Sequence, residues 1–469
     1  MIAGSQISVV SGGSDRLFLR AFADNEYLRE ASNLNDWKRE KLPRLISNYM
    51  ARHRRMVERG VPFLVVFGPE ASGIYPEHLP EGYKIQSPTA CEILAQELSA
   101  RGVRVICPSE AMRRAKGPVD VCLKLDSHWS NFGAYICYLE IMDALGAPFV
   151  SATVPWQEVY YEERIGYGDL GVQVSPERKG YIQHVKIPNI PVQASKNIFD
   201  IRDKNLRRFH NPRGIGKALI YRDSFTNALS AFFEATFSET YLVAPAPMML
   251  DSAVDQFNPD VVILEVAERA LFGYEDPFAD WSVRTFAQEY LEIADNPAGG
   301  RLQVQALNAI YEGKFDDAVA LAASAIAREG ENPRIYNLAW ALHRKERFEL
   351  CYQVTSHASD KLNDPFIYYL EADSASFMGN TDAAVKAITK ALEIQPMNAL
   401  YLFLQGEWLL QLGESERALE ALKRSILYAP LHDRSWTRAI DACDSLGRHE
   451  ESKRFRQARV EAFEGGQGL

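Results

Sequence analysis

The last third of this 469-residue chain repeats a pattern every 33 or 34 residues. A small side chain at a fixed place in each repeat lets two helices cross closely, and a unit of this length holds two helices. The pattern therefore predicts stacked helical hairpins, each of which buries its apolar face against its neighbours. The five matching stretches, GKFDDA, ERFELC, GNTDAA, GESERA and GRHEES, begin at Gly313, Glu346, Gly379, Gly413 and Gly447 and end at Ala318, Cys351, Ala384, Ala418 and Ser452.

Prolines recur between these units, at Pro333, Pro365, Pro396 and Pro430. Together with the period near 34, they make residues 299–466 resemble the tetratricopeptide repeat family. The resemblance implies an all-α solenoid of about five units over residues 301–466. Solenoids present extended concave surfaces, so we expect a protein partner to bind this array.

The residues upstream of the repeats predict a different fold. Asp295-Asn-Pro-Ala-Gly-Gly300 contains a proline and two glycines, which are typical of a linker. Residues 1–294 are therefore expected to form a separate domain. Continuous apolar runs there are typical of strands buried on both faces. Helical segments such as Trp37 to Arg59 and Pro88 to Arg101 lie between them, so we expect an α/β domain with a parallel sheet covered by helices. The runs are Pro62 to Phe67, Val103 to Ile106, Lys217 to Tyr221 and Val261 to Leu264.

Residues 151–215 break this rhythm of strands and helices. They predict an insertion made of loops or of a small antiparallel element.

Composition excludes several classes of function. The net charge of −10 disfavours nucleic acid as a partner, and the chain has no apolar run of about 18 residues that could span a membrane. The amino terminus lacks the basic start and apolar core of a signal peptide, which predicts a cytoplasmic protein, or a periplasmic one if the start is mis-called. The six cysteines show no CxxC spacing, so we expect free thiols and no metal site.

The first motif with catalytic potential is Asp126-Ser-His128-Trp129. In an extended segment Asp126 and His128 point to the same side, because side chains alternate along a strand. A carboxylate beside an imidazole can hold one tautomer and stabilise the imidazolium. The alternative is a surface loop whose histidine only caps the helix that starts near Gly133.

The second motif is Arg222-Asp223-Ser224-Phe225, between a predicted strand and the helical run Thr226 to Phe237. A serine at this place is exposed at the carboxyl edge of the sheet, where backbone N–H groups can bind an oxyanion. Alternatively, Asp223 or Ser224 is simply the N-cap of the helix. Taken together, the two motifs supply the nucleophile, base and orienting carboxylate of a Ser-His-Asp triad.

Residues 15–272 resemble the SGNH hydrolase-like domain of the alginate O-acetyltransferase family, whose members acetylate bacterial polysaccharides. Six pieces occur in the family's order, and one family lysine has no equivalent within Glu70-Ala-Ser-Gly73. The pieces are Asp15-Arg-Leu-Phe-Leu19, the loop from Gly68 to Pro80, Asp126-Ser-His128-Trp129, Gly168-Asp169-Leu170, Arg222-Asp223-Ser224-Phe225, and Pro259 to Ile263 with Glu268-Arg269.

The resemblance implies a role for each triad residue. Ser224 is the nucleophile that becomes acetylated, His128 is the general base and later the acid, and Asp126 orients His128. Such a reaction requires an acetyl donor, either acetyl-coenzyme A, which a cytoplasmic site would favour, or an acetyl group supplied by a partner, and we expect no bound cofactor. The activity implied is an O-acetyltransferase that acts on a carbohydrate hydroxyl. The alternatives are a carbohydrate acetyl esterase with the same triad, and a non-catalytic glycan-binding scaffold.

Five further residues are candidates for contacts with the substrate, and each has a structural alternative. Tyr75 and Trp129 could stack on a sugar ring or pack in the core. Arg269 could line the site or form an ion pair with a neighbour. His210 could reach the substrate or lie in an ordinary loop, and Asp223 could line the site or cap a helix.

Overall fold

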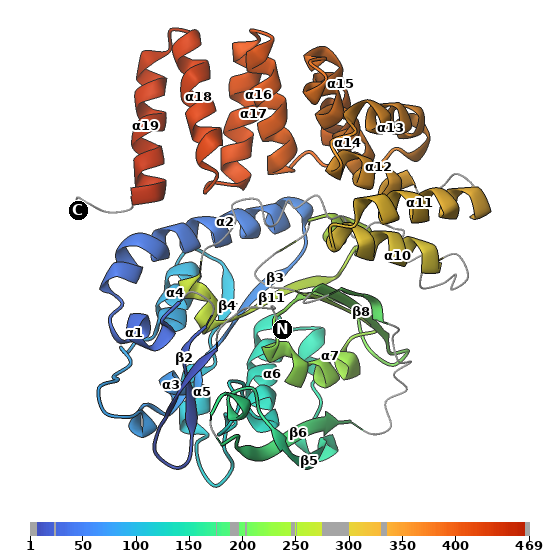
Figure 1. The fold of residues 1–469 in the computed structure, drawn as a ribbon. Helices are drawn as coiled ribbons and strands as arrows, with labels where there is room; N and C mark the ends of the chain where they lie inside the picture. Colours follow the sequence, from blue (N-terminus) through green and yellow to red (C-terminus); the bar gives the residue numbers. More distant parts are fainter. Residues whose placement is uncertain are drawn as a thin grey trace. The chain divides into compact units, whose positions relative to one another are not determined.

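The computed structural model describes residues 7–22, 25–174, 176–187, 197–201, 204–244, 249, 251–273, 300–329 and 335–464 (Figure 1). The chain divides into two compact units. The main part of the first is Met1–Met249 with Phe257–Asp276, and that of the second is Pro277–Phe463. The predicted linker falls almost wholly within residues 274–299, outside the described residues.

The first unit is built on a seven-stranded mixed sheet. All four predicted strands are present, and they pair in parallel with one another and with β10. Every residue of β3 and β11 is buried, as a strand covered on both faces requires. The strand order is β4 (Arg104–Ile106), β3 (Phe63–Gly68), β11 (Val261–Ala267), β9 (Lys217–Tyr221), β10 (Glu239–Ala244), β8 (Lys204–His210) and β7 (Asn197–Ile201).

Helices cover both faces of this sheet and confirm the predicted α/β domain. Figure 1 shows α2 and α4 on one side of the sheet and α6 and α7 on the other. The helices are α1 (Tyr27–Ser32), α2 (Leu42–Arg59, after a π-helical turn Trp37–Lys41), α3 (Ala71–Ile74), α4 (Ala90–Ser99), α5 (Ser109–Arg114), α6 (Asn131–Leu145), α7 (Ser230–Thr236) and α8 (Asp251–Phe257). A small antiparallel pair, β1 (Ser8–Ser11) and β2 (Leu17–Ala21), precedes them.

The segment predicted as an insertion, residues 151–215, contains two kinds of strand. The strands β5 (Tyr160–Tyr167) and β6 (Lys179–Lys186) form a separate antiparallel hairpin. By contrast, β7 and β8 extend the main sheet as its antiparallel edge.

The second unit consists, in its described part, of five consecutive pairs of helices, which confirms the predicted tetratricopeptide array. The residues that begin the five stretches all adopt a positive φ of 58° to 78°, which ends the first helix of each pair. The five small residues are fully buried. The pairs are α10 (Gly300–Tyr311) with α11 (Phe315–Glu329), α12 (Ile335–Arg344) with α13 (Phe348–Leu362), α14 (Pro365–Phe377) with α15 (Thr381–Ile394), α16 (Ala399–Gln411) with α17 (Ser415–Tyr428), and α18 (Asp433–Ser445) with α19 (His449–Glu464).

None of the described helices combines the length and hydrophobicity that a membrane span requires.

Candidate active site

The loop that carries Asp126 and His128 is closed by an antiparallel bridge between Cys122 and Trp129. Within it, Oδ1 of Asp126 accepts a hydrogen bond from the backbone N–H of His128 at 3.0 Å. The same oxygen lies 2.6 Å from Nδ1 of His128. This double contact fixes the imidazole and leaves Nε2 for a second partner.

That second partner is Ser224, whose Oγ lies 2.7 Å from Nε2 of His128. Ser224 follows β9 at the carboxyl edge of the parallel strands and is exposed. The capping role belongs to Asp223 instead: its Oδ1 accepts from the Phe225 N–H at 2.8 Å and its Oδ2 from the Ala267 N–H at 2.7 Å. The structure therefore brings Ser224, His128 and Asp126 into one hydrogen-bonded chain, with Asp223 bracing the turn rather than facing the substrate.

The pKa values of the two partners move in opposite directions. Burial lowers the pKa of His128, but the hydrogen bond to Asp126 and the charges of Asp126 and Asp169 outweigh it, so the pKa lies above its usual value. Burial raises the pKa of Asp126, but the hydrogen bond and charge of His128, together with the backbone N–H groups of Asp169 and His128, outweigh it and lower the pKa to about 2. A stably ionised carboxylate next to an imidazole with a raised pKa is suited to hold a proton taken from Ser224.

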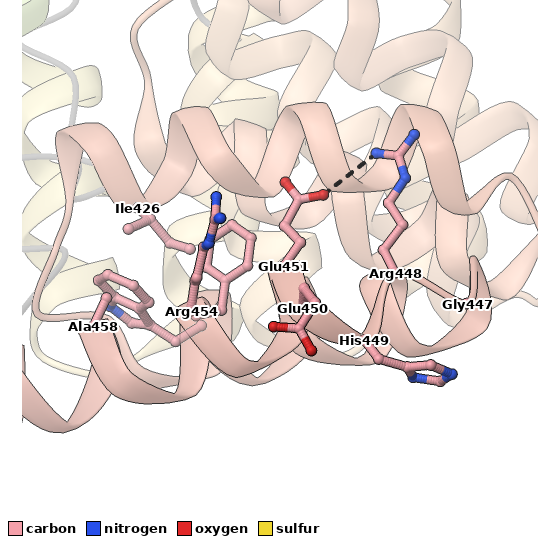
Figure 2. Close-up of a pocket in the computed structure, with 10 residues that line it drawn as sticks. Ile426, Gly447, Arg448, His449, Glu450, Glu451, Arg454 and Ala458 are labelled. Atoms are coloured by element: carbon pink, nitrogen blue, oxygen red, sulfur yellow. Dashed lines mark ion pairs between the residues drawn. The ribbon is translucent and has the colours of Figure 1, made fainter.

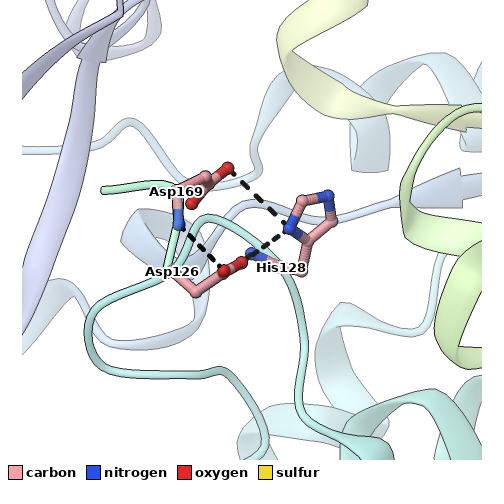
Figure 3. Close-up of side chains that lie close together, drawn as sticks. All are labelled: Asp126, His128 and Asp169. Atoms are coloured by element: carbon pink, nitrogen blue, oxygen red, sulfur yellow. Dashed lines mark hydrogen bonds and ion pairs between the residues drawn. The ribbon is translucent and has the colours of Figure 1, made fainter. Parts of the chain in front are cut away.

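A second carboxylate, Asp169, approaches His128 from the loop that connects β5 to β6 (Figure 3). Its Oδ2 lies 3.8 Å from Nδ1 of His128, and its backbone N–H donates to Oδ2 of Asp126 at 3.0 Å. The two oxygens of Asp169 accept from the N–H and Oγ–H of Ser127 at 2.6 and 2.5 Å. Nothing in the sequence predicted this role of Asp169 except its place in the Gly168-Asp169-Leu170 piece.

Arg269 supports the catalytic loop, residues 122–129, which carries Asp126 and His128. Its guanidinium forms a buried ion pair with Glu70 and donates to Oγ and O of Ser127 at 2.9 and 3.0 Å. Arg269 thus forms the ion pair that was the structural alternative, and it also holds the loop of Asp126 and His128. Its buried position does not support a direct contact with substrate.

The two predicted aromatic contacts lie in the core. Trp129 is 2% exposed and donates from Nε1 to the Phe225 carbonyl at 2.9 Å, which ties the His128 loop to the Ser224 turn. Tyr75 is 5% exposed, with the Arg16 guanidinium 4.0 Å from its ring centre and its hydroxyl accepting from the Val121 N–H at 3.0 Å. Because neither ring has a free face, both serve the packing role that was the alternative.

His210 lies at the amino-terminal end of the parallel strands, whereas Ser224 lies at their carboxyl end. It pairs with Glu239 at the start of β10, which in turn pairs with Lys217 at the start of β9. Ser224 follows the other end of β9. This placement corrects the prediction that His210 reaches the substrate: β8 runs antiparallel to β10, so its end is remote from the carboxyl edge.

Asp126, His128 and Asp169 also form the single group among the described residues whose spacing could hold a metal ion. Their ligand atoms are already engaged, however, in the contact between Asp126 and His128 and in the hydrogen bonds from Ser127 to Asp169. The donor set therefore fits a hydrogen-bonded catalytic group better than a metal centre.

Each of the two units contains a pocket. One, of about 700 Å³, lies beside Asp126 between the catalytic loop and the β5–β6 hairpin. The other, of about 940 Å³, lies in the last repeat (Figure 2). Its lining combines Trp436 and Phe455 with charged side chains, among them Arg448 just before α19 and Glu451 and Arg454 within it.

Comparison with known families agrees with this geometry. Residues 22–194 match the family described as SGNH hydrolase-like domain, acetyltransferase AlgX, and residues 369–427 match a tetratricopeptide repeat family. The first unit thus contains an SGNH hydrolase-like enzyme domain, in the class of acyltransferases and ester hydrolases. More particularly, its matched segment is similar to the acetyltransferase AlgX domain, and tetratricopeptide repeats follow it. The match includes Asp126, His128 and Asp169 and ends before Ser224.

Solved structures show more distant similarity. A DHHW family protein from Eubacterium siraeum is 15% identical, with a TM-score of 0.43 and coverage of 57% of this chain and 95% of its own. The O-acetyltransferase domain of Pseudomonas putida AlgJ is 15% identical, with a TM-score of 0.41 and coverage of 62% and 100%. The MamA protein is 16% identical, with a TM-score of 0.33 and coverage of 35% and 92%. Comparison with curated proteins found no match.

Proposed function

We propose that this protein is an O-acetyltransferase that moves an acetyl group to a carbohydrate hydroxyl through an acetyl-serine intermediate at Ser224. The observation that carries the proposal is the hydrogen-bonded chain from Ser224 Oγ through His128 to Asp126. A serine hydroxyl is a weak nucleophile until a neighbouring base removes its proton, and His128 is placed to do so. The AlgX acetyltransferase type of the domain supports acetyl as the group transferred.

The reaction would proceed in two halves. In the first, Ser224 Oγ bonds to the carbonyl carbon of the donor as its proton passes to Nε2 of His128, and the donor's alcohol or thiol leaves with that proton. In the second, a sugar hydroxyl gives its proton to His128 and bonds to the acetyl carbon, and the Ser224 oxygen leaves and recovers the proton. Asp126 stays ionised throughout and stabilises the imidazolium.

Each half passes through a tetrahedral oxyanion. The backbone N–H of Ser224 has no hydrogen-bond partner among the described residues, so it is free to donate to this oxygen. A single such donor contributes on the order of 100-fold to the rate in serine enzymes.

We propose that the donor is an acetyl ester or thioester that binds transiently. Acetyl-coenzyme A and an acetyl group delivered by a partner both meet this requirement.

The second candidate is a carbohydrate acetyl esterase. It is favoured by the exposure of Ser224, which gives water access to the same intermediate. A test supplies an acetyl donor together with an acceptor oligosaccharide and measures both acetylated sugar and free acetate. Acetylated sugar formed by the wild type and absent with Ser224→Ala would support transfer, whereas free acetate alone would support the esterase. Transfer undiminished in Ser224→Ala would refute both.

We also propose that the repeat array binds a protein partner. The pocket in the last repeat supports this, because it joins aromatic side chains to exposed charges, as peptide-binding sites do. A scaffold without catalysis is disfavoured, since a retired site has no chemical reason to keep all three triad side chains in contact.

A further inference from the structure

The β5–β6 hairpin presents a row of exposed apolar side chains on one face. Ile165 is 73% exposed, Tyr181 66% and Tyr167 44%. Ile165 pairs directly with Tyr181, and Tyr167 pairs with Lys179, so these four residues share one face. Large apolar side chains that gather at the surface mark binding sites more often than isolated ones do.

This hairpin is fastened to the catalytic loop. The N–H of Gly171, in the connection between its strands, donates to the Leu125 carbonyl at 2.9 Å. The Asp169 N–H donates to Asp126, as described above. A Cβ at Gly168 would lie only 2.2 Å from the Leu125 oxygen, so the two loops touch backbone to backbone. The exposed face is therefore held at a fixed place relative to the triad.

The pocket of about 700 Å³ joins the two loops. Leu125 and Asp126 line it from the catalytic loop, and Arg178 to Tyr181 line it from the hairpin. Neither His128 nor Ser224 lines it, so it does not hold the reacting group.

The charges in this pocket balance locally. Arg178 lies 3.6 Å from the carboxylate of Asp15, and Lys124 lies 3.8 Å from that of Asp120. Paired charges of both signs offer donors and acceptors to hydroxyl groups without attracting an ion, and the exposed tyrosine ring offers a flat apolar surface. A neutral sugar chain, with C–H faces and many hydroxyls, matches both features.

We propose that this pocket and the Tyr181 face bind neutral sugar units that flank the unit acetylated at Ser224. The inference rests on the proposed function and adds to it the subsite and the class of acceptor. The occupant is an oligosaccharide longer than one unit, since the pocket stands beside the triad rather than at its nucleophile.

The test is a ligand-observed NMR titration of the full chain with maltohexaose, cellohexaose and N-acetylchitohexaose. Tyr181→Ala is compared with Tyr181→Phe and with Tyr160→Ala. Tyr160 is a matched control, because it is 59% exposed on the same hairpin but points to the opposite face. We expect Tyr181→Ala to weaken binding of at least one probe by about threefold to tenfold, as loss of one stacking ring predicts. Tyr181→Phe and Tyr160→Ala should bind as the wild type does.

Equal binding by Tyr181→Ala, equal losses in Tyr160→Ala, or no binding of any probe to the wild type would overturn the inference. A change of oligomeric state in Tyr181→Ala, measured by light scattering, would also overturn it, because the face would then be an interface between copies. Acetylation of wild-type Ser224 by p-nitrophenyl acetate separates this failure from failure of the proposed function, since that reaction needs no sugar.

Discussion

At the scale of single residues, the pKa of His128 sets the pH at which Ser224 can be activated. Only the neutral imidazole accepts a proton, so the rate falls as pH falls through this pKa. Because Asp126 and Asp169 raise the pKa, the loss should begin above the usual value of about 6.5. We expect p-nitrophenol release from p-nitrophenyl acetate to rise with pH to a plateau. A rate independent of pH between 5 and 8 would contradict this role of His128.

Replacing Asp126 removes the largest of the interactions that raise the pKa of His128. In Asp126→Asn the pKa of His128 should fall, because burial would then act against a weaker opposing interaction. The pH profile should shift to lower pH, and the plateau rate should drop by at least about 100-fold as the imidazolium loses its counter-charge. An unchanged profile measured by p-nitrophenol release would show that Asp126 does not act through His128.

Asp169 should act in the same direction but more weakly, since its oxygen is 3.8 Å from Nδ1. Asp169→Asn should move the acidic limb to lower pH, with a smaller loss of plateau rate than Asp126→Asn gives. Asp143→Asn, on the exposed side of α6, is the control and should leave the profile unchanged. A loss of plateau rate without a shift of the limb would show that Asp169 only shapes the loop.

The two motifs in the sequence named the three residues that the structure joins, but the sequence could not assign the residues that hold them. Asp169 reaches His128 because the loop after β5 contacts the loop of Asp126, although the two lie 43 residues apart in the sequence. Similarly, nothing local distinguishes a buried Trp129 from an exposed one, because its burial depends on Phe225 in a distant turn.

At the scale of elements, the repeat turns depend on one backbone conformation. Gly413 has a φ of +77° with open space around it, whereas Glu346 adopts +58° with a side chain. Gly413→Ala should destabilise the protein by about 1 kcal/mol, because the strain of alanine in a left-handed conformation exceeds the entropy that glycine loses on folding. Glu346→Gly should stabilise it by a similar amount. Thermal unfolding followed by circular dichroism measures both, and effects of equal sign would contradict the explanation.

The catalytic loop makes a steric demand of its own on Gly168. Any Cβ there meets the Leu125 oxygen at 2.2 Å and Cβ of Asp126 at 2.8 Å, so Gly168→Ala must displace the loop. We expect Ser224 acetylation to fall by on the order of 100-fold, as small misplacements do in active sites. Gly117→Ala is the control, since its nearest non-neighbouring atom is 3.9 Å away. Full activity in Gly168→Ala would refute the coupling of hairpin and loop.

The continuous apolar runs predicted β3, β4, β9 and β11, but not β10 or the antiparallel edge that β8 and β7 form. The strand β8, Lys204–His210, has the sequence KNLRRFH, which is too polar for a strand to be predicted from it. It joins the sheet through antiparallel pairing with β10, which depends on distant residues rather than on its own pattern. The 33- or 34-residue period was a stronger signal for the helical repeats, because the same turn and the same small residue recur in each of the five units.

At the scale of the whole molecule, the chain combines an enzyme unit with an array suited to bind another protein. The boundaries of the predicted domains, 1–294 and 301–466, and of the linker 295–300 fall almost wholly outside the described residues and remain predictions. The sequence predicts the change of architecture between them, from strands alternating with helices to helices alone.

The array should act as a docking surface through the pocket of the last repeat. Arg454 is exposed and lines this pocket, whereas Lys453 is exposed on the same helix and does not line it. We expect Arg454→Glu in the full chain to lose partners that the wild type retains in a pull-down and Lys453→Glu to keep them. Identical partners for both variants would place the docking surface elsewhere.

Intact-mass spectrometry tests most directly whether Ser224 becomes acetylated. The full chain and the Ser224→Ala variant are each measured after reaction with p-nitrophenyl acetate. We predict one acetyl adduct on the wild type and none on the variant, because the Ser224 hydroxyl lies 2.7 Å from the His128 base. An adduct of equal yield on both proteins, or a wild type that neither forms an adduct nor releases p-nitrophenol, would contradict an acetyl-serine mechanism.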